Sequence, residues 1–321
     1  MRIASILSSL ILLAGCTSSL EIGEGSVSSL TLSLKGGTDE APVGSVKVWA
    51  FRCDAQGAVS KMDNVAYGES EGQPSLSMDL SSDSRYYMVL AGVNLPSAAF
   101  GEGASFASLR SSKFAGRPDD DALTGWTVVD MAEAEGGHMD VSMEVAPVCG
   151  RLTLNVAKSS ETMVLRVDEV AVHSSGAPSQ GLYFAGLTGQ GTDLNHEPYS
   201  SVVAKGADVS GKGAYSCVAT AFLYEHTAGW SDLSAFREAG WSLDPSVADP
   251  DCAGYYMSIS YRYVTVPDAS LDSEEAVLVK KYIPLAPVLR GNEYKFNVMV
   301  SLDGVTVSGS TEVSEEVQGQ W

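Results

Sequence analysis

Apolar and polar residues alternate along most of the chain with a period of two, which is the pattern of half-buried β-strands. The stretch SSLTLSLKGG (28–37) sets Leu30, Leu32 and Leu34 against serine and threonine and ends at two glycines. GSVKVWAFRCDAQG (44–57) is a second strand that leaves through a turn sequence. The same pattern predicts strands at 75–80, 85–94, 138–145, 150–158, 163–173, 215–224, 255–266, 277–284, 292–300 and 303–318.

Two segments have helical spacing instead. Phe106, Leu109 and Phe114 of GASFASLRSSKF roughly share one helix face, and SDLSAFREAG (231–240) begins with Ser231 as an N-cap. No period of 20 to 50 residues repeats, which argues against a solenoid or a propeller. Many short strands with few short helices predict an all-β fold of β-sandwiches.

The first fifteen residues have the features of a signal peptide. An apolar run follows Arg2 and is too short to span a bilayer as a helix. It ends in the letters LAGC at Cys16, and this ending resembles the lipobox of bacterial lipoproteins, in which the cysteine is acylated and becomes the new N-terminus. We expect a signal peptide at 1–15, a lipid on Cys16 and a lipidated tether at 16–27. The alternative is an ordinary signal peptide with an incidental cysteine.

The remaining 306 residues suggest two domains of about 150 residues each. A change of composition at EVAPVCGRL, where Pro147 and Gly150 interrupt the strand pattern, marks the boundary. We therefore expect an N-terminal β-sandwich domain at 28–146 and a C-terminal β-sandwich domain at 147–321.

The chain after the signal peptide is strongly acidic. It has 19 Lys and Arg against 40 Asp and Glu, a net charge of −21. Such a body repels phosphate backbones and anionic lipid, so we expect no nucleic-acid partner, and contact with the membrane through the lipid alone. No cofactor is expected beyond the covalent lipid on Cys16.

Four cysteines remain besides Cys16, and none forms a C-x-x-C motif that would indicate zinc. In an exported chain they are able to form disulfides. Two interpretations stay open: buried thiols that behave as small hydrophobic groups, or one disulfide, for which Cys217 and Cys252 are the better candidate pair. The four are Cys53, Cys149, Cys217 and Cys252.

No constellation of residues indicates catalysis or metal binding. The four histidines are scattered and none lies at metal-ligand spacing from another. Neither a nucleophile elbow nor a P-loop is present. Asp119, Asp120 and Asp121 lack the alternating spacing and terminal glutamate of a calcium loop, so a solvated acidic turn is favoured. We expect a protein that is not an enzyme and holds no metal.

Several short segments occur in an order typical of one family. They are SLTLSLKGG after the lipobox, YYMVLAGVNLPS (86–97), CGRLTLNV (149–156), FLYEH (222–226) and VLRGNEYKFNVMV (288–300). In this order and spacing the chain resembles, nearly end to end, the fimbrillin-type pilus proteins of Bacteroidales, a superfamily of lipoprotein precursors. The resemblance implies two tandem transthyretin-like β-sandwich domains, other fimbrial subunits as partners, and a fimbrium at the outer membrane as the location.

One departure from the family pattern bears on the role within a fimbria. Stalk pilins of this family carry an arginine just after the first strand, where an Arg-specific protease cuts and thereby opens a groove for a neighbouring subunit's strand. The linker at 36–44 contains no arginine, and the first arginine after Cys16 is Arg52, inside a predicted strand. Leu30, Leu32 and Leu34 would then stay in place and fill the groove of their own domain, as in an anchor or accessory subunit. Lys35 leaves room for a protease of another specificity.

The C-terminal tail has the alternating pattern of a strand that could be donated to another subunit. Its apolar positions are Val305, Val307, Val313 and Val317. The alternative is an ordinary edge strand of the second domain.

The competing function is a surface glycan-binding lipoprotein that recognises a host or bacterial ligand. Such a protein needs a solvent-facing row of aromatic side chains. Trp230 and Trp241 flank the second predicted helix, although packing onto a sheet is favoured for them. A hydrolase is disfavoured because no nucleophile or acid-base constellation is present. We expect a fimbrial subunit that anchors the fimbria or is an accessory component.

Overall fold

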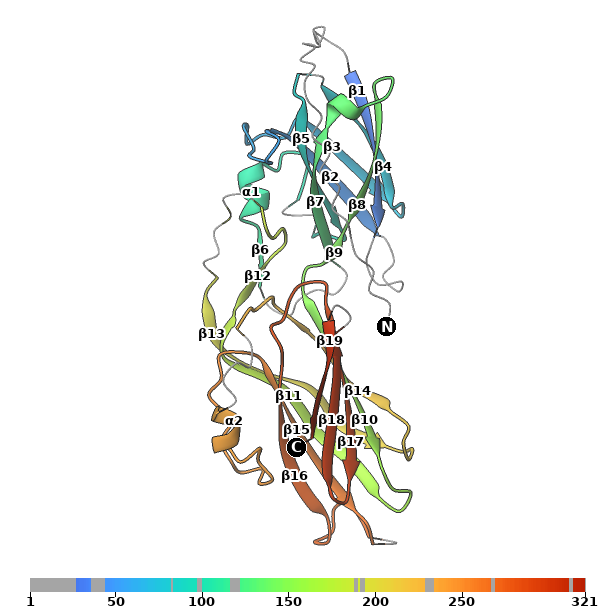
Figure 1. Cartoon of the computed structure of the whole chain (residues 1–321), viewed down its shortest axis with the longest axis vertical. Coiled ribbons are helices and arrows are strands. Elements are labelled where there is room, and N and C mark those ends of the chain that lie inside the picture. Colours follow the sequence, from blue (N-terminus) through green and yellow to red (C-terminus); the bar gives the residue numbers. More distant parts are fainter. Residues whose placement is uncertain are drawn as a thin grey trace, which may run out of the picture.

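The computed structural model describes ten parts of the chain, and these form two β-sandwiches placed end to end along the long axis (Figure 1). The described residues are 27–35, 44–81, 83–96, 100–115, 122–187, 190, 194–228, 234–266, 269–311 and 314–320.

The first sandwich has its core between a three-stranded and a five-stranded sheet. The three-stranded sheet has the order β4-β1-β8, and the five-stranded sheet has the order β3-β2-β5-β7-β9. The strands are β1 (Val27–Lys35), β2 (Ser45–Cys53), β3 (Ala66–Glu71), β4 (Ser75–Ser81), β5 (Tyr86–Val93), β7 (Leu123–Asp130), β8 (His138–Glu144) and β9 (Ala146–Pro147), with a 3-10 turn at Met131–Glu133.

The five-stranded sheet is buried on both faces. Every residue from Val46 to Phe51 in β2 is buried, and so is every residue from Tyr87 to Val93 in β5, so burial is continuous along both strands instead of alternating. One face meets the sandwich core, and the other is covered by the short helix α1 (Phe106–Arg110) and by aromatic side chains. Ser105 caps this helix, because its side chain accepts a hydrogen bond from the Ser108 N–H.

The second sandwich packs the sheet β14-β10-β17-β18-β19 against the sheet β13-β11-β15-β16. Tyr256, Tyr282 and Phe236 of α2 (Ser234–Glu238) cover the outer face of the four-stranded sheet. The strands are β10 (Gly150–Lys158), β11 (Val164–Pro178), β13 (His196–Val209), β14 (Ser216–Leu223), β15 (Tyr256–Val264), β16 (Val277–Pro284), β17 (Glu293–Ser301), β18 (Gly304–Thr311) and β19 (Ser314–Gln320).

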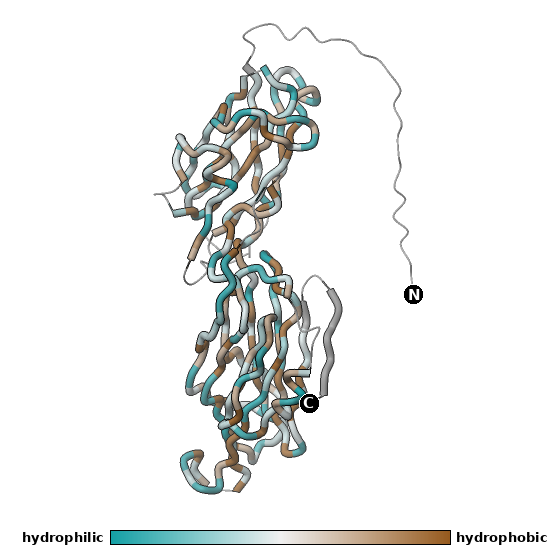
Figure 2. Tube along the Cα trace, turned by 90° about the vertical axis from the view of Figure 1, so that its left-hand side faces the viewer, coloured by the Kyte–Doolittle hydropathy of each residue, from teal (hydrophilic) through white to brown (hydrophobic). Residues whose placement is uncertain are grey.

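The chain passes from the first sandwich to the second between β9, which pairs in the first, and β10, which pairs in the second. One small two-stranded sheet joins the two halves of the chain, because β6 (Lys113–Ala115) of the first half pairs with β12 (Gln180–Leu182) of the second. Hydrophobic and hydrophilic residues alternate along the chain in both bodies (Figure 2). The predicted all-β fold of β-sandwiches with minor short helices is confirmed.

Some predicted elements were wrong in extent. The tail predicted as one strand at 303–318 forms two strands, β18 and β19, which pair antiparallel. Phe114 lies in β6 and not on the predicted first helix, and Ser231 lies outside the described residues. Six strands were missed, namely β3, β6, β7, β9, β12 and β13.

Candidate functional site

The first strand, β1, is the central strand of its sheet. It pairs antiparallel with β4 and parallel with β8. Leu30 and Leu32 are 0% and 1% exposed in the first core, and the half-buried Leu34 packs against that core. Because both neighbours hydrogen-bond to β1, removal of this strand would leave two unpaired strand edges and an apolar groove.

On the face of β1 opposite the three leucines, polar side chains contact both neighbouring strands and support the register. The Ser29 Oγ lies 2.7 Å from His138 Nδ1, and the Thr31 Oγ1 lies 2.8 Å from Ser77 Oγ. Cys16 and the linker at 36–43 lie outside the described residues. Arg52, the first arginine after Cys16, is in β2 and forms an ion pair with Asp83.

The C-terminal tail is built into its own domain. Val305 and Val307 are 3% and 6% exposed and belong to the core of the second sandwich, in β18 paired with β17. These two valines thus lie in the core of their own domain, which favours for them the alternative of an ordinary strand of the second domain over a donated strand. Val313 lies outside the described residues. Val317 lies in β19, the edge strand of the sheet, where it is the Cα partner of Gly309.

Cys217 and Cys252, the candidate pair for a disulfide, both carry thiols, so of the two open interpretations the structure has free thiols. Cys217 is exposed in β14, whereas Cys252 is buried in the cluster on the outer face of the other sheet, so the sandwich separates the two side chains. Cys53 and Cys149 are buried thiols as well. Burial, with a contribution from Asp54, raises the pKa of Cys53 to about 11, so this thiol is protonated at neutral pH.

An aromatic cluster joins the two sandwiches. Trp49 in β2 meets Phe184 of the second half edge to face, with ring centroids 6.2 Å apart. Phe100 and Tyr183 are 4.9 Å apart in the same kind of contact. Phe114 lies 5.4 Å from Tyr224. The two domains therefore share one hydrophobic cluster in addition to the β6–β12 pairing.

Arg290 links the same two parts by charge-assisted hydrogen bonds. Its Nη2 donates to the Thr124 Oγ1 of β7 and to the Tyr183 carbonyl, both at 2.8 Å, and its Nη1 donates to the Leu182 carbonyl at 3.5 Å. The Thr124 hydroxyl in turn donates to the Tyr183 carbonyl at 2.5 Å. Burial lowers the pKa of the Arg290 guanidinium. Arg290 lies in the VLRGNEYKF segment, but sequence alone did not reveal that one of its partners, Thr124, is in the other domain.

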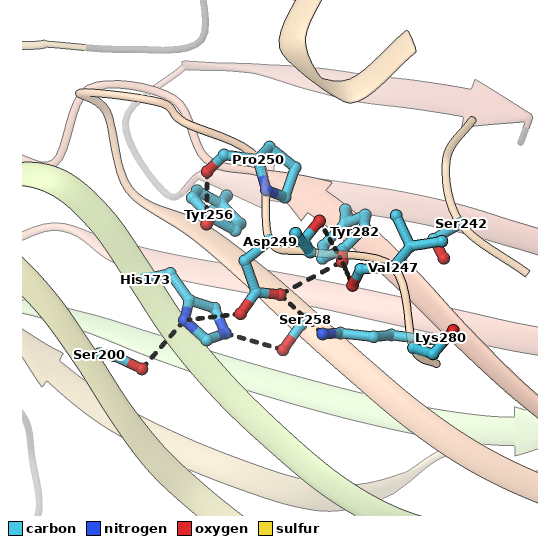
Figure 3. A network of polar contacts seen from close by, with 12 residues as sticks. His173, Ser200, Ser242, Val247, Asp249, Pro250, Tyr256, Ser258, Lys280 and Tyr282 are labelled. Carbon is cyan, nitrogen blue, oxygen red and sulfur yellow. Dashed lines mark hydrogen bonds and ion pairs between the residues drawn. The ribbon is translucent and has the colours of Figure 1, made fainter. Parts of the chain in front are cut away.

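A polar network covers the outer face of the four-stranded sheet (Figure 3). His173 Nε2 lies 2.8 Å from Ser258 Oγ, and His173 Nδ1 lies 3.1 Å from Ser200 Oγ. Asp249 accepts hydrogen bonds from Lys280 at 2.6 Å and from the Tyr282 hydroxyl at 3.2 Å. The network ties the segment at 242–253 to β15 and β16, since Tyr256 also donates to the Pro250 carbonyl at 2.7 Å.

The residue types of this network match those of a serine hydrolase, but the geometry does not. His173 Nδ1 is 3.9 Å from Asp249, too far for the hydrogen bond that orients a catalytic histidine. Ser258 is 4% exposed, and the His173 ring stacks on Tyr256 with centroids 5.1 Å apart. Burial lowers the pKa of His173, which keeps the ring neutral at pH 7. The arrangement holds a loop in place and leaves Ser258 no room to attack a substrate.

The features needed for a glycan platform or a metal site are not brought together in the described residues. The exposed aromatic side chains there are Trp126, in β7, and Tyr215, just before β14, so they form no row. Trp241 stacks on Phe236 at 5.8 Å, while Trp230 and Asp119 to Asp121 lie outside the described parts. Within those parts, no group of three His, Cys, Asp or Glu side chains is placed to hold a metal. No helix described there has both the length and the apolar composition of a membrane span.

No family model matches the chain, and no curated protein matches it. Solved structures do match it over most of its length. The tip fimbrial protein Mfa3 of Porphyromonas gingivalis, with C-terminal truncation, superposes with a TM-score of 0.52 at 10% identity, covering 89% of this chain and 99% of that one. A cell adhesion protein of Bacteroides eggerthii gives 0.51 at 13% identity, with 88% and 95% covered. A fimbrial protein of Bacteroides vulgatus gives 0.51 at 10% identity, with 89% and 99% covered.

The chain therefore has the fold of Bacteroidales fimbrial and cell adhesion proteins. The resemblance seen in the sequence is confirmed at the level of the fold.

Proposed function

We propose that the protein is a non-enzymatic fimbrial subunit that anchors the fimbria at the outer membrane through a lipid on Cys16. The fold supports a role in a fimbria. The position of β1 carries the proposal for the anchor: it fills its own domain between β4 and β8, with Leu30 and Leu32 fully buried. A subunit whose β1 groove is filled accepts no donor strand in that groove, so it ends a fimbria instead of extending it.

Cleavage at an arginine would not open this groove. The chain has no arginine between Cys16 and Arg52, and Arg52 lies in β2, whose neighbouring residues are core. A cut there would remove a central strand of the five-stranded sheet together with β1. The first strand and the lipid at Cys16 therefore stay on one polypeptide, and the lipid would hold the fimbria to the membrane.

The strand offered to the next subunit is β19. It is an edge strand that pairs only with β18 in the described sheet, so its release costs one ladder and leaves the Val305 and Val307 core intact. On release, its backbone groups are free to complete the sheet of a neighbouring subunit. Within the tail, only its last strand, β19, is therefore the proposed donor.

A disulfide lock tests this function in cells. Ser308 and Gln318 are Cα partners on β18 and β19, and opposite positions of an antiparallel pair lie within disulfide range. The double variant Ser308→Cys/Gln318→Cys should be exported and lipidated normally but should shed its fimbriae into the medium, and reductant should restore attachment. Each single cysteine variant is the matched control and should keep fimbriae attached. Normal attachment by the oxidised double variant would refute donation of β19.

A further inference from the structure

A cavity of about 480 Å³ lies between β13 and β14 in the second sandwich. Neither strand belongs to the proposed donor or to the β1 groove. The lining residues come from the end of β11 and the residue after it, from the first half of β13, and from the end of β14 and the residue after it: Ala177, Pro178, Ser179, Glu197 to Val203, Thr220 to Phe222, and Tyr224.

Both walls of this cavity are edge strands. In the described sheets β13 pairs only with β11, and β14 pairs only with β10. The two strands lie against each other, but no ladder joins them. Edge strands present rows of backbone N–H and C=O groups that have no strand partner, and such rows bind other extended chains. The backbone beside the cavity is therefore suited to receive a strand.

The side chains of the cavity divide into an apolar interior and a polar rim. Val203 and Ala221 pack with the sandwich core, and Tyr224 belongs to the aromatic cluster between the domains. Ser179 and Thr220 supply hydroxyls beside them. An extended peptide directs alternate side chains to opposite sides, so one set would enter the apolar interior while the other stays in water.

The charge of the cavity restricts its occupant. Glu197 is the charged residue among the lining residues, it is exposed, and the surrounding chain is strongly acidic. A basic segment is therefore attracted to the cavity, and an acidic segment is repelled.

We infer that this cavity binds an extended, basic peptide segment of another polypeptide, by strand addition to β14 with alternate apolar side chains inside. The inference rests on the proposed function, because a fimbrial subunit works among partners that present such segments. It assigns the second domain a docking site separate from the β1 groove.

The geometry favours a peptide over a saccharide. Sugars stack on exposed aromatic faces, but Tyr224 is 4% exposed. The Tyr199 ring packs edge to face on Tyr255, with centroids 5.6 Å apart. Neither ring offers the flat, open face that a sugar needs, whereas the strand edges remain available.

The test measures binding of synthetic heptapeptides to the purified full chain by fluorescence anisotropy. The probe has the sequence Lys-Val-Thr-Val-Thr-Val-Thr. A second peptide begins with Glu, a third has the same composition without alternation, and a fourth carries N-methyl groups on alternate amides and so cannot pair along a strand edge. The Lys probe should bind at a ratio of one to one, and the other three should bind more weakly. A mixture of neutral oligosaccharides is tested in parallel.

Variants place the binding in the cavity. Ser201→Trp fills it from the inner face of β13 and should weaken the Lys probe more than about tenfold, equivalent to 1.4 kcal/mol. Asp208→Trp adds the same side chain to an exposed position of the same strand outside the cavity and should have no effect. Glu197→Lys should reverse the preference, so that the Glu peptide binds more tightly than the Lys peptide. The ratio of the two affinities should change by about fivefold, which is the scale of an exposed ion pair. Glu161→Lys, an exposed site far along the chain, should not.

Absence of peptide binding, equal binding of the N-methyl probe, or binding unchanged by both Ser201→Trp and Glu197→Lys would overturn the inference. Preferential binding of the oligosaccharides would also overturn it, in favour of a glycan site. Should Ser201→Trp fail to fold, the charge exchange at Glu197 decides. Because the β18–β19 lock is scored by attachment of fimbriae in cells, failure of the proposed function is distinguishable from failure of this site.

Discussion

Arg290 is predicted to stabilise the joint between the two sandwiches, where it bonds both to Thr124 of the first domain and to the Tyr183 carbonyl of its own. Its guanidinium makes two hydrogen bonds of 2.8 Å, to Thr124 Oγ1 and to the Tyr183 carbonyl. Hydrogen bonds to a charged group contribute about 1.5–3 kcal/mol each. Arg290→Met removes both, but it also removes the cost of burying the charge, and the Tyr183 carbonyl keeps its bond from Thr124. The net loss in free energy of unfolding should be about 2–4 kcal/mol.

The assay is equilibrium unfolding in guanidinium chloride followed by the fluorescence of the five tryptophans, of which Trp49 and Trp126 lie near the joint. Arg290→Lys should fall between wild type and Arg290→Met, because lysine keeps a charge but cannot reproduce the planar fork. Arg237→Met is the matched control on the exposed face of α2 and should change stability by less than about 0.5 kcal/mol. If Arg290→Met unfolds at the same denaturant concentration as Arg237→Met, the assignment of the joint to this guanidinium is wrong.

Three further predictions follow from the first strand, the leader and the buried histidines. Leu32→Ala should cost about 2–5 kcal/mol of unfolding free energy in thermal or denaturant melts and Leu34→Ala clearly less, because Leu32 is 1% exposed and Leu34 is half-buried; equal losses would contradict the packing. Cys16→Ala should move the protein from the membrane to the soluble fraction, and a variant that stays bound through a high-salt wash would refute the lipid anchor. Burial lowers the pKa of His173 and His226 below 6.5, so in acid the unfolded chain binds more protons than the folded chain. The contribution of these neutral histidines to the free energy of unfolding is therefore complete above pH 6.5 and is lost as the pH falls below it. His173→Gln should flatten this loss in melts recorded from about pH 7.5 to 5, and an unchanged slope would remove His173 as a cause.

The pattern of residues predicted the strands that bury apolar side chains, and it failed where burial was not the reason for the strand. β2 and β5 were predicted because apolar side chains recur along them, and most of their residues are buried. β13 was missed because most of its residues are polar and exposed, and its strand form depends on pairing with β11. β7 was missed in part because Gly125 looks like a turn, whereas a Cβ there would collide with the Glu144 carbonyl.

The candidate site was predictable where it depends on local pattern and unpredictable where it depends on distant partners. Leu30 and Leu32 were identified by alternation alone. The tail also alternates, but alternation cannot distinguish a strand kept in its own domain from one offered to another, and Val305 and Val307 are in their own core. The bond from Arg290 to Thr124 joins residues 166 positions apart, and no local signal marks such a pair.

The central claim is that the mature protein keeps its first strand and its lipid while it is part of a fimbria. Intact mass spectrometry of the protein, extracted together with attached fimbriae from cells, tests this most directly. We expect a single species that begins at an acylated Cys16 and includes Val27–Lys35. A species that begins after Lys35, with the lipid and β1 removed, would show that the groove is opened and that the protein is a link within the fimbria instead of its end.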